Sequence, residues 1–168
     1  QRHSVTCGLH VSYLAGNKTS IILAEKKQLE KHLKQPITSS RHHYLRTCHV
    51  TDMEALQQIG IMHDYTLGFA DRLGFRLGTT RPVKYLSPYT LQVGSIFLHP
   101  LLAMDTTLFY YMNLSFQQAF EQLTYYIQTV KKYGGECVLL WHNTTLGQGI
   151  AHKNFYKKIL QQLQQTFG

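Results

Sequence analysis

Segments typical of β-strands alternate with amphipathic helical segments along most of this chain, and this alternation limits its fold more than any other feature. The clearest helix is predicted over residues 114–135, where apolar side chains recur at helical spacing, Ser115 and Gln118 form a capping box, and Gly134 follows the last turn. The next segment, "ECVLLWHN" (residues 136–143), is a continuous apolar run typical of a strand covered on both faces. Alternation of this kind predicts an α/β fold with parallel strands.

The same two patterns recur elsewhere in the chain. Further strands are predicted over residues 4–13, 37–44, 61–69 and 95–105. Further helices are predicted over residues 20–34, 51–60 and 152–166. Thr51 and Glu54 are expected to form a capping box, and the Gly- and Pro-containing stretch 71–95 is predicted to be a long loop. The length and the absence of an evident linker predict a single domain over residues 1–168.

Composition and charge narrow the class of protein. Hydrophobic residues make up 43% of the chain and charged residues 15%, which is typical of a globular protein. No apolar run reaches the roughly 18 residues that a membrane-spanning helix requires, so no membrane span is predicted. The formal net charge of +8 comes largely from basic clusters on predicted helices, which indicate solvated helix faces or, alternatively, a polyanionic partner. Because no nucleic-acid-binding motif accompanies this charge, nucleic acid is not the expected partner.

The three cysteines give a weak indication of compartment. Cys7, Cys48 and Cys137 lie in strand-like surroundings and form no C-x-x-C pair. An odd count argues against a disulfide framework, so buried thiols and a reducing, cytoplasmic compartment are favoured. The chain opens on Gln1 rather than Met, so the N-terminus itself predicts no localisation.

Polar side chains gather where the predicted strands end: His10, Asp64, Asp105, His142 and the "RHHYLR" cluster of residues 41–46. In a (β/α) barrel the carboxyl ends of the strands form one rim, and that rim carries the active site. Imidazoles and carboxylates are also the ligands of a catalytic zinc, and a His at a strand end can act as a general acid. The chain has no H-E-x-x-H, H-x-H or C-x-x-C motif, so exposed loop histidines and hydrogen-bonded strand ends are the alternative interpretation.

Five segments follow one another in the order seen in one known family: "GLHVSY", "SRHHYLR", "HDYTLGFADRLGFRLGT", "PLLAMDTTL" and "VLLWHN". In this respect the chain resembles polysaccharide deacetylase-like proteins of the NodB-homology group (carbohydrate esterase family four), in particular a divergent bacterial branch. The resemblance covers roughly residues 8–165 and implies a distorted (β/α) barrel of about seven strands. It also implies a hydrolase that uses a divalent metal, often zinc, to remove acetyl or similar acyl groups from a carbohydrate substrate.

The resemblance assigns roles to individual residues. His10 corresponds to a metal ligand, and His142 corresponds to the acid that protonates the leaving group. Arg41 corresponds to the residue that orients the catalytic base. Asp64 is assigned to the catalytic set, because it falls with Asp71 in the region of the carboxylate that tunes the acid. The residues assigned to substrate binding are Tyr44, His43, Arg46, Asp71 and Trp141.

Two departures from the family pattern bear on these roles. Leu14 stands where the family has its second metal-binding His, and the Asp-rich first motif, which supplies a metal ligand and the base, does not occur in the chain. We therefore expect the C-terminal part of a longer enzyme, inactive on its own and lacking the N-terminal strand of the barrel. The alternative is a non-catalytic member that binds glycans or acts as a scaffold. A barrel without its first strand has an exposed edge, which predicts a homo-oligomer or a partner at that edge.

Overall fold

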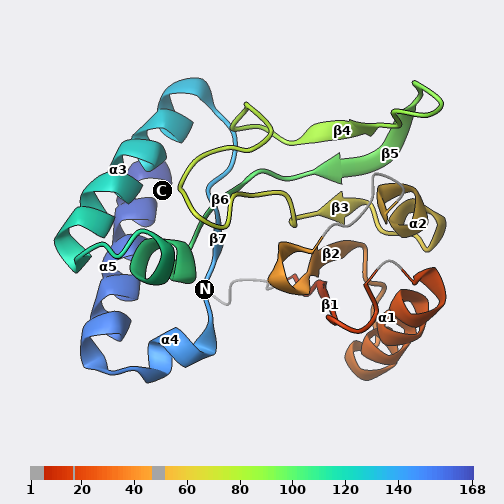
Figure 1. Ribbon diagram of the computed structural model, residues 1–168, viewed down its shortest axis with the longest axis horizontal. Helices are drawn as coiled ribbons and strands as arrows, with labels where there is room; N and C mark the ends of the chain where they lie inside the picture. The colour runs from red at the N-terminus through yellow and green to blue at the C-terminus, as the bar shows by residue number, and fades with distance from the viewer. Residues whose placement is uncertain (1–5, 17, 47–51) are drawn as a thin grey trace. The chain divides into compact units, whose positions relative to one another are not determined.

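The computed structural model describes residues 6–16, 18–46 and 52–168. The chain divides into two compact units, each of which is described by itself. Unit 1 is drawn from Gln1–Leu67 and Pro82–His99, and unit 2 from Gly68–Arg81 and Pro100–Gly168. The fold is mixed α/β with mostly parallel strands, as the alternation of segments predicts (Figure 1). A single domain over residues 1–168 stays a prediction.

Unit 1 is built on a five-stranded sheet with the order β1-β2-β3-β5-β4. Its strands are β1 (Leu9–Val11), β2 (Ser39–His42), β3 (His63–Asp64), β4 (Val83–Leu86) and β5 (Val93–Leu98). All of them run parallel except β4, which pairs antiparallel with β5. The connecting helices are α1 (Thr19–Leu33), the 3-10 turn η1 (His43–Leu45) and α2 (Asp52–Gln58). Because β1, β2 and β3 are parallel, their carboxyl ends share one edge of the sheet.

The interior of unit 1 is aliphatic. Its large aliphatic side chains that are at most 1% exposed are Val11, Ile22, Leu56, Ile61, Ile37 and Ile96. Ile22 is the one fully buried side chain of α1. This helix ends as predicted, shortly before Pro36, with Lys34 in the left-handed region and its N–H donating to the carbonyl of Glu30.

Two predicted elements of this region are corrected by the structure. The stretch 71–95 is not one loop, because it contains β4 and the start of β5, which pair as an antiparallel ribbon. The predicted strand 95–105 is in fact two strands, β5 and β6 (Leu101–Met104), which belong to different sheets. The break falls at Pro100, which has no N–H to continue a strand ladder.

Unit 2 combines a short sheet with three helices. Parallel β6 and β7 (Val138–Leu140) form the sheet, and the π-helical turn η2 (Thr107–Tyr111) follows β6. The helices are α3 (Phe116–Tyr133), α4 (Asn143–Gly147) and α5 (Ile150–Phe167). Helices α3 and α5 lie against each other (Figure 1). The core of this unit consists of Leu73, Leu102, Ala103, Leu108, Ala119, Leu123, Phe155 and Ile159.

The ends of α3 show why this helix was predictable. Ser115 caps it, with Oγ accepting from the N–H of Gln118 and the Gln118 side chain accepting from the N–H of Ser115, which confirms the capping box. After the helix, Gly135 has φ +120, and an added Cβ would collide with the carbonyl of Thr80. A glycine is therefore required where the 68–81 segment of unit 2 meets the end of α3.

The other predicted capping box involves Thr51 and stays a prediction. Thr51 lies outside the described residues, and the carboxylate of Glu54 accepts from Ser87 Oγ at 2.6 Å. Glu54 thus ties α2 to the end of β4.

Several expectations about architecture stay predictions. The described residues contain seven strands, but these form a five-stranded and a two-stranded sheet, and closure into a barrel is not detected among them. In unit 1 the edge strands are β1 and β4, and a partner at such an edge stays a prediction. Within the described ranges, no helix combines the length and the apolar character needed to cross a membrane.

Candidate functional site

The parallel pairing of β6 with β7 brings together Asp105 and His142, which are 37 residues apart in sequence. Met104, the last residue of β6, is in register with Leu140, the last residue of β7. Asp105 follows β6 at once, and His142 follows β7 after one intervening residue. The two side chains therefore meet at the carboxyl edge of this small sheet.

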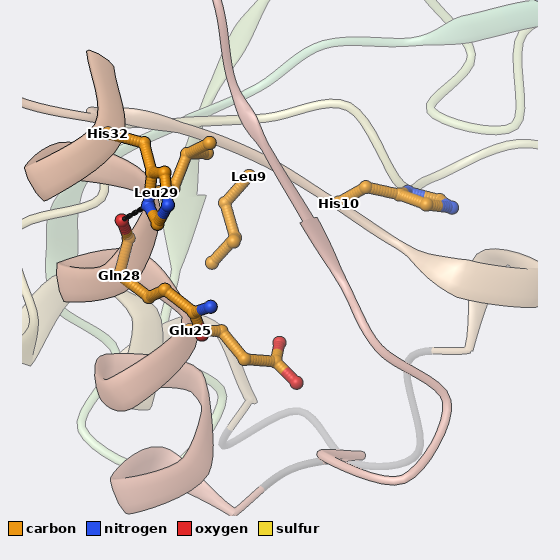
Figure 2. Close-up of a pocket in the computed structure, with 6 residues that line it drawn as sticks. All are labelled: Leu9, His10, Glu25, Gln28, Leu29 and His32. Atoms are coloured by element: carbon orange, nitrogen blue, oxygen red, sulfur yellow. Dashed lines mark hydrogen bonds between the residues drawn. The ribbon is translucent and has the colours of Figure 1, made fainter.

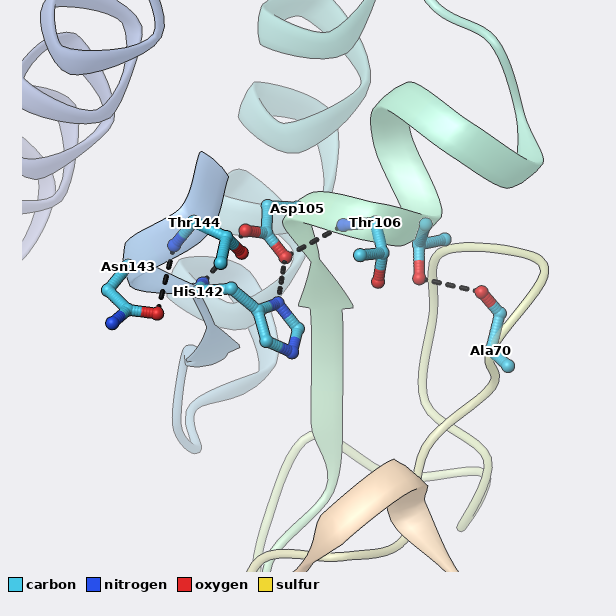
Figure 3. Close-up of polar contacts among 7 residues, drawn as sticks. Ala70, Asp105, Thr106, His142, Asn143 and Thr144 are labelled. Atoms are coloured by element: carbon cyan, nitrogen blue, oxygen red, sulfur yellow. Dashed lines mark hydrogen bonds and ion pairs between the residues drawn. The ribbon is translucent and has the colours of Figure 1, made fainter. Parts of the chain in front are cut away.

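Asp105 accepts from three N–H donors, two of which belong to His142 (Figure 3). The ring Nδ1 of His142 lies 2.6 Å from Asp105 Oδ1, and the backbone N–H of His142 donates to Oδ2 at 2.8 Å. The backbone N–H of Thr106 donates to Oδ1 at 2.7 Å. The Asp105 side chain is 0% exposed, whereas that of His142 is 39% exposed. The carboxylate is thus fixed in the interior while the imidazole reaches solvent.

The orientation of the imidazole decides what this pair can do. Because a carboxylate only accepts hydrogen bonds, Nδ1 is the nitrogen that carries the proton and donates to Asp105. Figure 3 shows the other ring nitrogen, Nε2, on the side of the ring turned away from Asp105. An imidazole held in one tautomer by a buried carboxylate, with Nε2 directed outward, can take up a proton and release it to a bound molecule.

We call Asp105 and His142 the dyad. Segments on either side of the dyad fix its surroundings. Thr107 Oγ1 donates to the carbonyl of Ala70 at 2.8 Å, which ties η2 to the 68–81 segment of unit 2. On the other side, Asn143 Oδ1 accepts from the N–H of Thr144 at 2.9 Å in the first turn of α4 (Figure 3). The edge that carries the dyad is therefore braced on both sides by local hydrogen bonds.

Two residues predicted to bind substrate in unit 2 have other surroundings. The ring of Trp141 packs against Phe155 and Tyr156, with ring centres 6.0 and 5.1 Å away, so much of it belongs to the hydrophobic core. Asp71 is exposed and pairs with Arg72, whose guanidinium holds the pKa of this carboxyl below its ordinary value. The carboxylate that contacts the candidate acid His142 is Asp105, a role that the sequence analysis places in the region of Asp64 and Asp71.

Asp64, predicted as catalytic, lies in unit 1 inside a cage of hydroxyl groups. Its Oδ2 accepts from Ser40 Oγ at 2.8 Å and from Thr66 Oγ1 at 2.9 Å, and its Oδ1 accepts from the N–H of Thr66 at 3.0 Å. The residue is 1% exposed, and this burial raises the pKa of its carboxyl, with the hydrogen bonds acting in the opposite direction. These contacts join β2 to β3, so the structure gives Asp64 a cross-strand structural contact.

Arg41, predicted to orient a catalytic base, is held close to the same cage. Its Nε donates to the carbonyl of Tyr65 at 3.1 Å, and its guanidinium lies 5.9 Å from the centre of the Tyr65 ring. Burial lowers the pKa of Arg41, and the nearby charge of Asp64 raises it in part. The described contacts of Arg41 therefore hold the segment that follows β3 in place.

His10, predicted as a metal ligand, stands in the middle of β1. Leu9, Glu25, Gln28, Leu29, His32 and His10 line a cleft of about 250 Å³ between β1 and α1. Figure 2 shows Leu9 on the α1 side of the strand and the ring of His10 on the opposite side. This placement follows from the alternation of side chains along a strand. The carboxylate of Glu25, which accepts from the N–H of Ser12, is thus not on the side of the His10 ring.

The surroundings of His10 do not complete the zinc site that the resemblance implies. Its Nδ1 donates to the carbonyl of Arg41 at 3.1 Å, an arrangement that suits a ligand binding through Nε2, and the ring of His43 lies 5.1 Å away, centre to centre. A catalytic zinc takes three protein ligands. In the described part of the chain, no three or more His, Cys, Asp or Glu side chains gather closely enough to hold an ion. The described residues therefore do not fit that metal site by themselves.

The remaining predicted substrate-binding residues lie together after β2. His43 and Tyr44 are exposed neighbours whose rings stack, with centres 4.6 Å apart. Arg46 follows them, and its guanidinium lies over the ring of Tyr13. This part of the "RHHYLR" cluster is thus an exposed surface, whereas His42 within the same cluster is 2% exposed.

A thiol nucleophile is not favoured by the surroundings of Cys137. Burial raises the pKa of this thiol to about 11, so very little of it is ionised at neutral pH.

The Asp105–His142 contact is what sequence reasoning missed. Both residues are recognisable as polar ends of apolar segments, which is the signal that identifies them as candidates. Their partnership depends on β6 pairing with β7, and a sequence alone does not state which strands pair. The resemblance places the tuning carboxylate in the region of Asp64 and Asp71, and that assignment stays a prediction.

Comparisons of the chain with models of known protein families, with curated proteins and with solved structures find no match. The functional assignment therefore rests on the geometry of the described residues and on the resemblance of sequence segments.

Proposed function

We propose that this chain supplies the acid–base dyad of a hydrolase that removes acyl groups from a glycan. The observation that carries the proposal is the 2.6 Å contact between His142 Nδ1 and the fully buried Asp105. The resemblance to polysaccharide deacetylases supports the same role, because His142 corresponds there to the acid that protonates the leaving group. The choice of a glycan as substrate comes from this resemblance.

The geometry of the dyad supports a complete proton cycle. His142 Nε2 accepts a proton from a water molecule as its oxygen bonds to the acyl carbon, and Asp105 stabilises the imidazolium that forms. Nε2 then donates that proton to the sugar oxygen or nitrogen as the bond from this atom to the acyl carbon breaks. The products are a carboxylic acid and the free sugar hydroxyl or amine, and His142 returns to its starting state.

The resemblance further proposes a divalent metal at His10 and a base oriented by Arg41. The described residues do not complete a site for such an ion. The proton cycle above uses only His142 and Asp105.

The leaving group provides a direct test of the acid. Acetate release from O- and N-acetylated oligosaccharides requires protonation of a poor leaving group, whereas 4-nitrophenolate leaves without it. We expect His142→Ala to lower kcat for the acetylated sugars by about 10²–10⁴-fold. The loss for 4-nitrophenyl acetate should be smaller, because that substrate loses only the base step of His142 and not the acid step. Assays with added zinc and with a chelator measure the metal requirement separately.

His32→Ala is the matched control, because it removes an exposed imidazole from α1 whose described contact is with the carbonyl of Gln28. Equal losses for the two classes of substrate would contradict the role of His142 as acid. Acetate release that does not change in His142→Ala would contradict the proposed function itself.

A second candidate function, glycan binding without catalysis, is favoured by one observation. Tyr13 is 51% exposed and Tyr44 is 79% exposed, and both line one cleft of unit 1. Exposed aromatic rings of this kind are suited to contact the C–H faces of sugars. Binding to acetylated oligosaccharides that is retained in His142→Ala, with no acetate released by the unaltered chain, would favour this candidate.

A further inference from the structure

The cleft at the carboxyl ends of β1 and β2 has features that neither the fold nor the dyad explains. It has a volume of about 630 Å³ and is lined by Tyr13, Tyr44 and Arg46, all within unit 1. Both rings are largely exposed, so they contribute little to a hydrophobic core.

The three side chains form an ordered arrangement. The rings of Tyr13 and Tyr44 meet edge to face, with centres 5.7 Å apart and planes at 76°. The guanidinium of Arg46 lies 4.7 Å from the centre of the Tyr13 ring, and its Nη1 donates to the carbonyl of Tyr13 at 3.3 Å. The positive charge is thus fixed beside a corner made of two aromatic faces.

The backbone holds Tyr44 at this corner in an unfavourable conformation. Tyr44 and Leu45 have φ +57 and φ +51, in the left-handed region that residues with a Cβ rarely adopt. One face of Tyr44 stacks on His43 with an interplanar angle of 7°. A strained residue that presents an exposed ring indicates a functional constraint, because burial of that ring does not offset the strain.

Charge identifies the class of ligand. Among the described residues that line this cleft there are one cation and no carboxylate, and the ring of His10 lies 5.1 Å from that of His43, tilted by 31°. The chain as a whole has 17 Lys and Arg against 9 Asp and Glu. A site with aromatic faces and a fixed guanidinium matches a ring that carries an anionic group, and Arg is well suited to a carboxylate.

We propose that this cleft binds an acidic sugar residue of a glycan, with the pyranose ring against Tyr44 and Tyr13 and its carboxylate on Arg46. The corner of two rings at 76° favours a non-planar ring with C–H groups on several sides, whereas stacked nucleobases require parallel aromatic faces. The inference deepens the proposed function by naming the substrate class, and it rests on that function only for the choice of a glycan.

Binding is measured by calorimetry on the full chain, using trigalacturonate and its methyl ester as probes. The ester keeps the rings and removes the charges. We expect the acid to bind about tenfold or more tightly than the ester, and Arg46→Gln to remove most of that difference. Tyr44→Asn is expected to weaken both probes, because Asn tolerates the left-handed backbone while the ring is lost.

Lys27→Gln is the matched control, since it removes an exposed positive charge from α1 in the same unit. It is expected to change the affinity for the acid less than twofold. Thermal melts of each variant test whether the fold is kept.

Several results would overturn the inference: equal affinities of the unaltered chain for acid and ester, unchanged affinity in Arg46→Gln, or a thymidine dodecamer that binds more tightly and loses affinity in Tyr44→Asn. The proposed function fails separately. Acid binding that persists in a chain without hydrolytic activity refutes the hydrolase and supports this cleft. Hydrolysis of sugar acetates by a chain that does not prefer the acid refutes the cleft alone.

Discussion

Asp64 in unit 1 and Asp105 in unit 2 are the same residue type at the carboxyl end of a buried strand, yet their partners differ. Asp64 is enclosed by two hydroxyls and one backbone N–H, which hold it between two strands. Asp105 is just as buried, but one of its oxygens accepts from an imidazole that reaches solvent. A carboxylate whose donors all lie inside the protein stabilises the fold, whereas one that orients an exposed titratable group can act on a bound molecule.

The largest expected effect tests the functional half of this comparison. Asp105→Asn replaces the acceptor of His142 Nδ1 with an amide and removes the negative charge that stabilises the imidazolium. We expect kcat for acetylated sugars to fall by about 10²–10⁴-fold. Initial rates of acetate release measure this, with Glu121→Gln, an exposed carboxylate on α3, as the control. Unchanged rates in Asp105→Asn would remove the distinction between the two aspartates.

The next effect tests the structural half. Asp64→Ala leaves Ser40 Oγ, Thr66 Oγ1 and the N–H of Thr66 without their acceptor in a buried place. We expect the free energy of unfolding to fall by about 3 kcal/mol. Urea denaturation followed by circular dichroism measures it. A loss below about 1 kcal/mol would mean that water replaces the carboxylate, and the cage would then not be a structural requirement.

A smaller effect concerns pH. Burial raises the pKa of Asp64 above its ordinary value of 3.8, so the folded state binds this proton more tightly than the unfolded state. The contribution of Asp64 to stability is therefore greatest below pH 3.8 and falls as pH rises from there through the raised pKa. Asp64→Asn has no such charge to bury. The free energy of unfolding of Asp64→Asn, measured relative to the unaltered chain, should therefore rise with pH across this window. A difference that does not change with pH would contradict the raised pKa of Asp64.

The smallest effect compares a helix of each unit. Helix α3 has the Ser115 capping box, whereas α1 begins after Lys18, which makes no side-chain capping hydrogen bond. We expect Ser115→Ala to lower the free energy of unfolding by about 1 kcal/mol and Lys18→Ser to raise it by a similar or smaller amount. Thermal melts of the two variants measure both changes. A stabilising Ser115→Ala would show that the box is not maintained in solution.

The sequence predicted best where local signals agree. The extent of α3 follows from its apolar stripe, its capping box and the glycines after it, and α1 and α5 follow from similar periodicity. Strand β4 and its pairing with β5 were missed because β4 is short and lies among Gly and Pro residues, which locally favour a loop. The break at Pro100 was missed because the apolar run continues through it, and only the three-dimensional pairing separates β5 from β6.

The sequence identified candidate residues of the site, but it did not show which of them contact each other. His142 and Asp105 were identified as polar strand ends, but their contact depends on the register of Met104 with Leu140. The exposed Tyr13 was not distinguished from a core tyrosine, since no local pattern shows that Arg46 would lie over its ring. Non-local pairing is the information that a single sequence does not contain.

The division of the chain has a consequence for its synthesis on the ribosome. All strands of the five-stranded sheet have been made once His99 is added. Leu73 is made earlier, but it belongs to a core that also contains Phe155 and Ile159. These two partners in that core are made only near the end of translation. Because chains fold as they emerge from the N-terminal side, unit 1 can mature while Leu73 is still exposed. The nascent chain thus passes through a stage in which one unit is formed and an apolar segment of the other is accessible to chaperones.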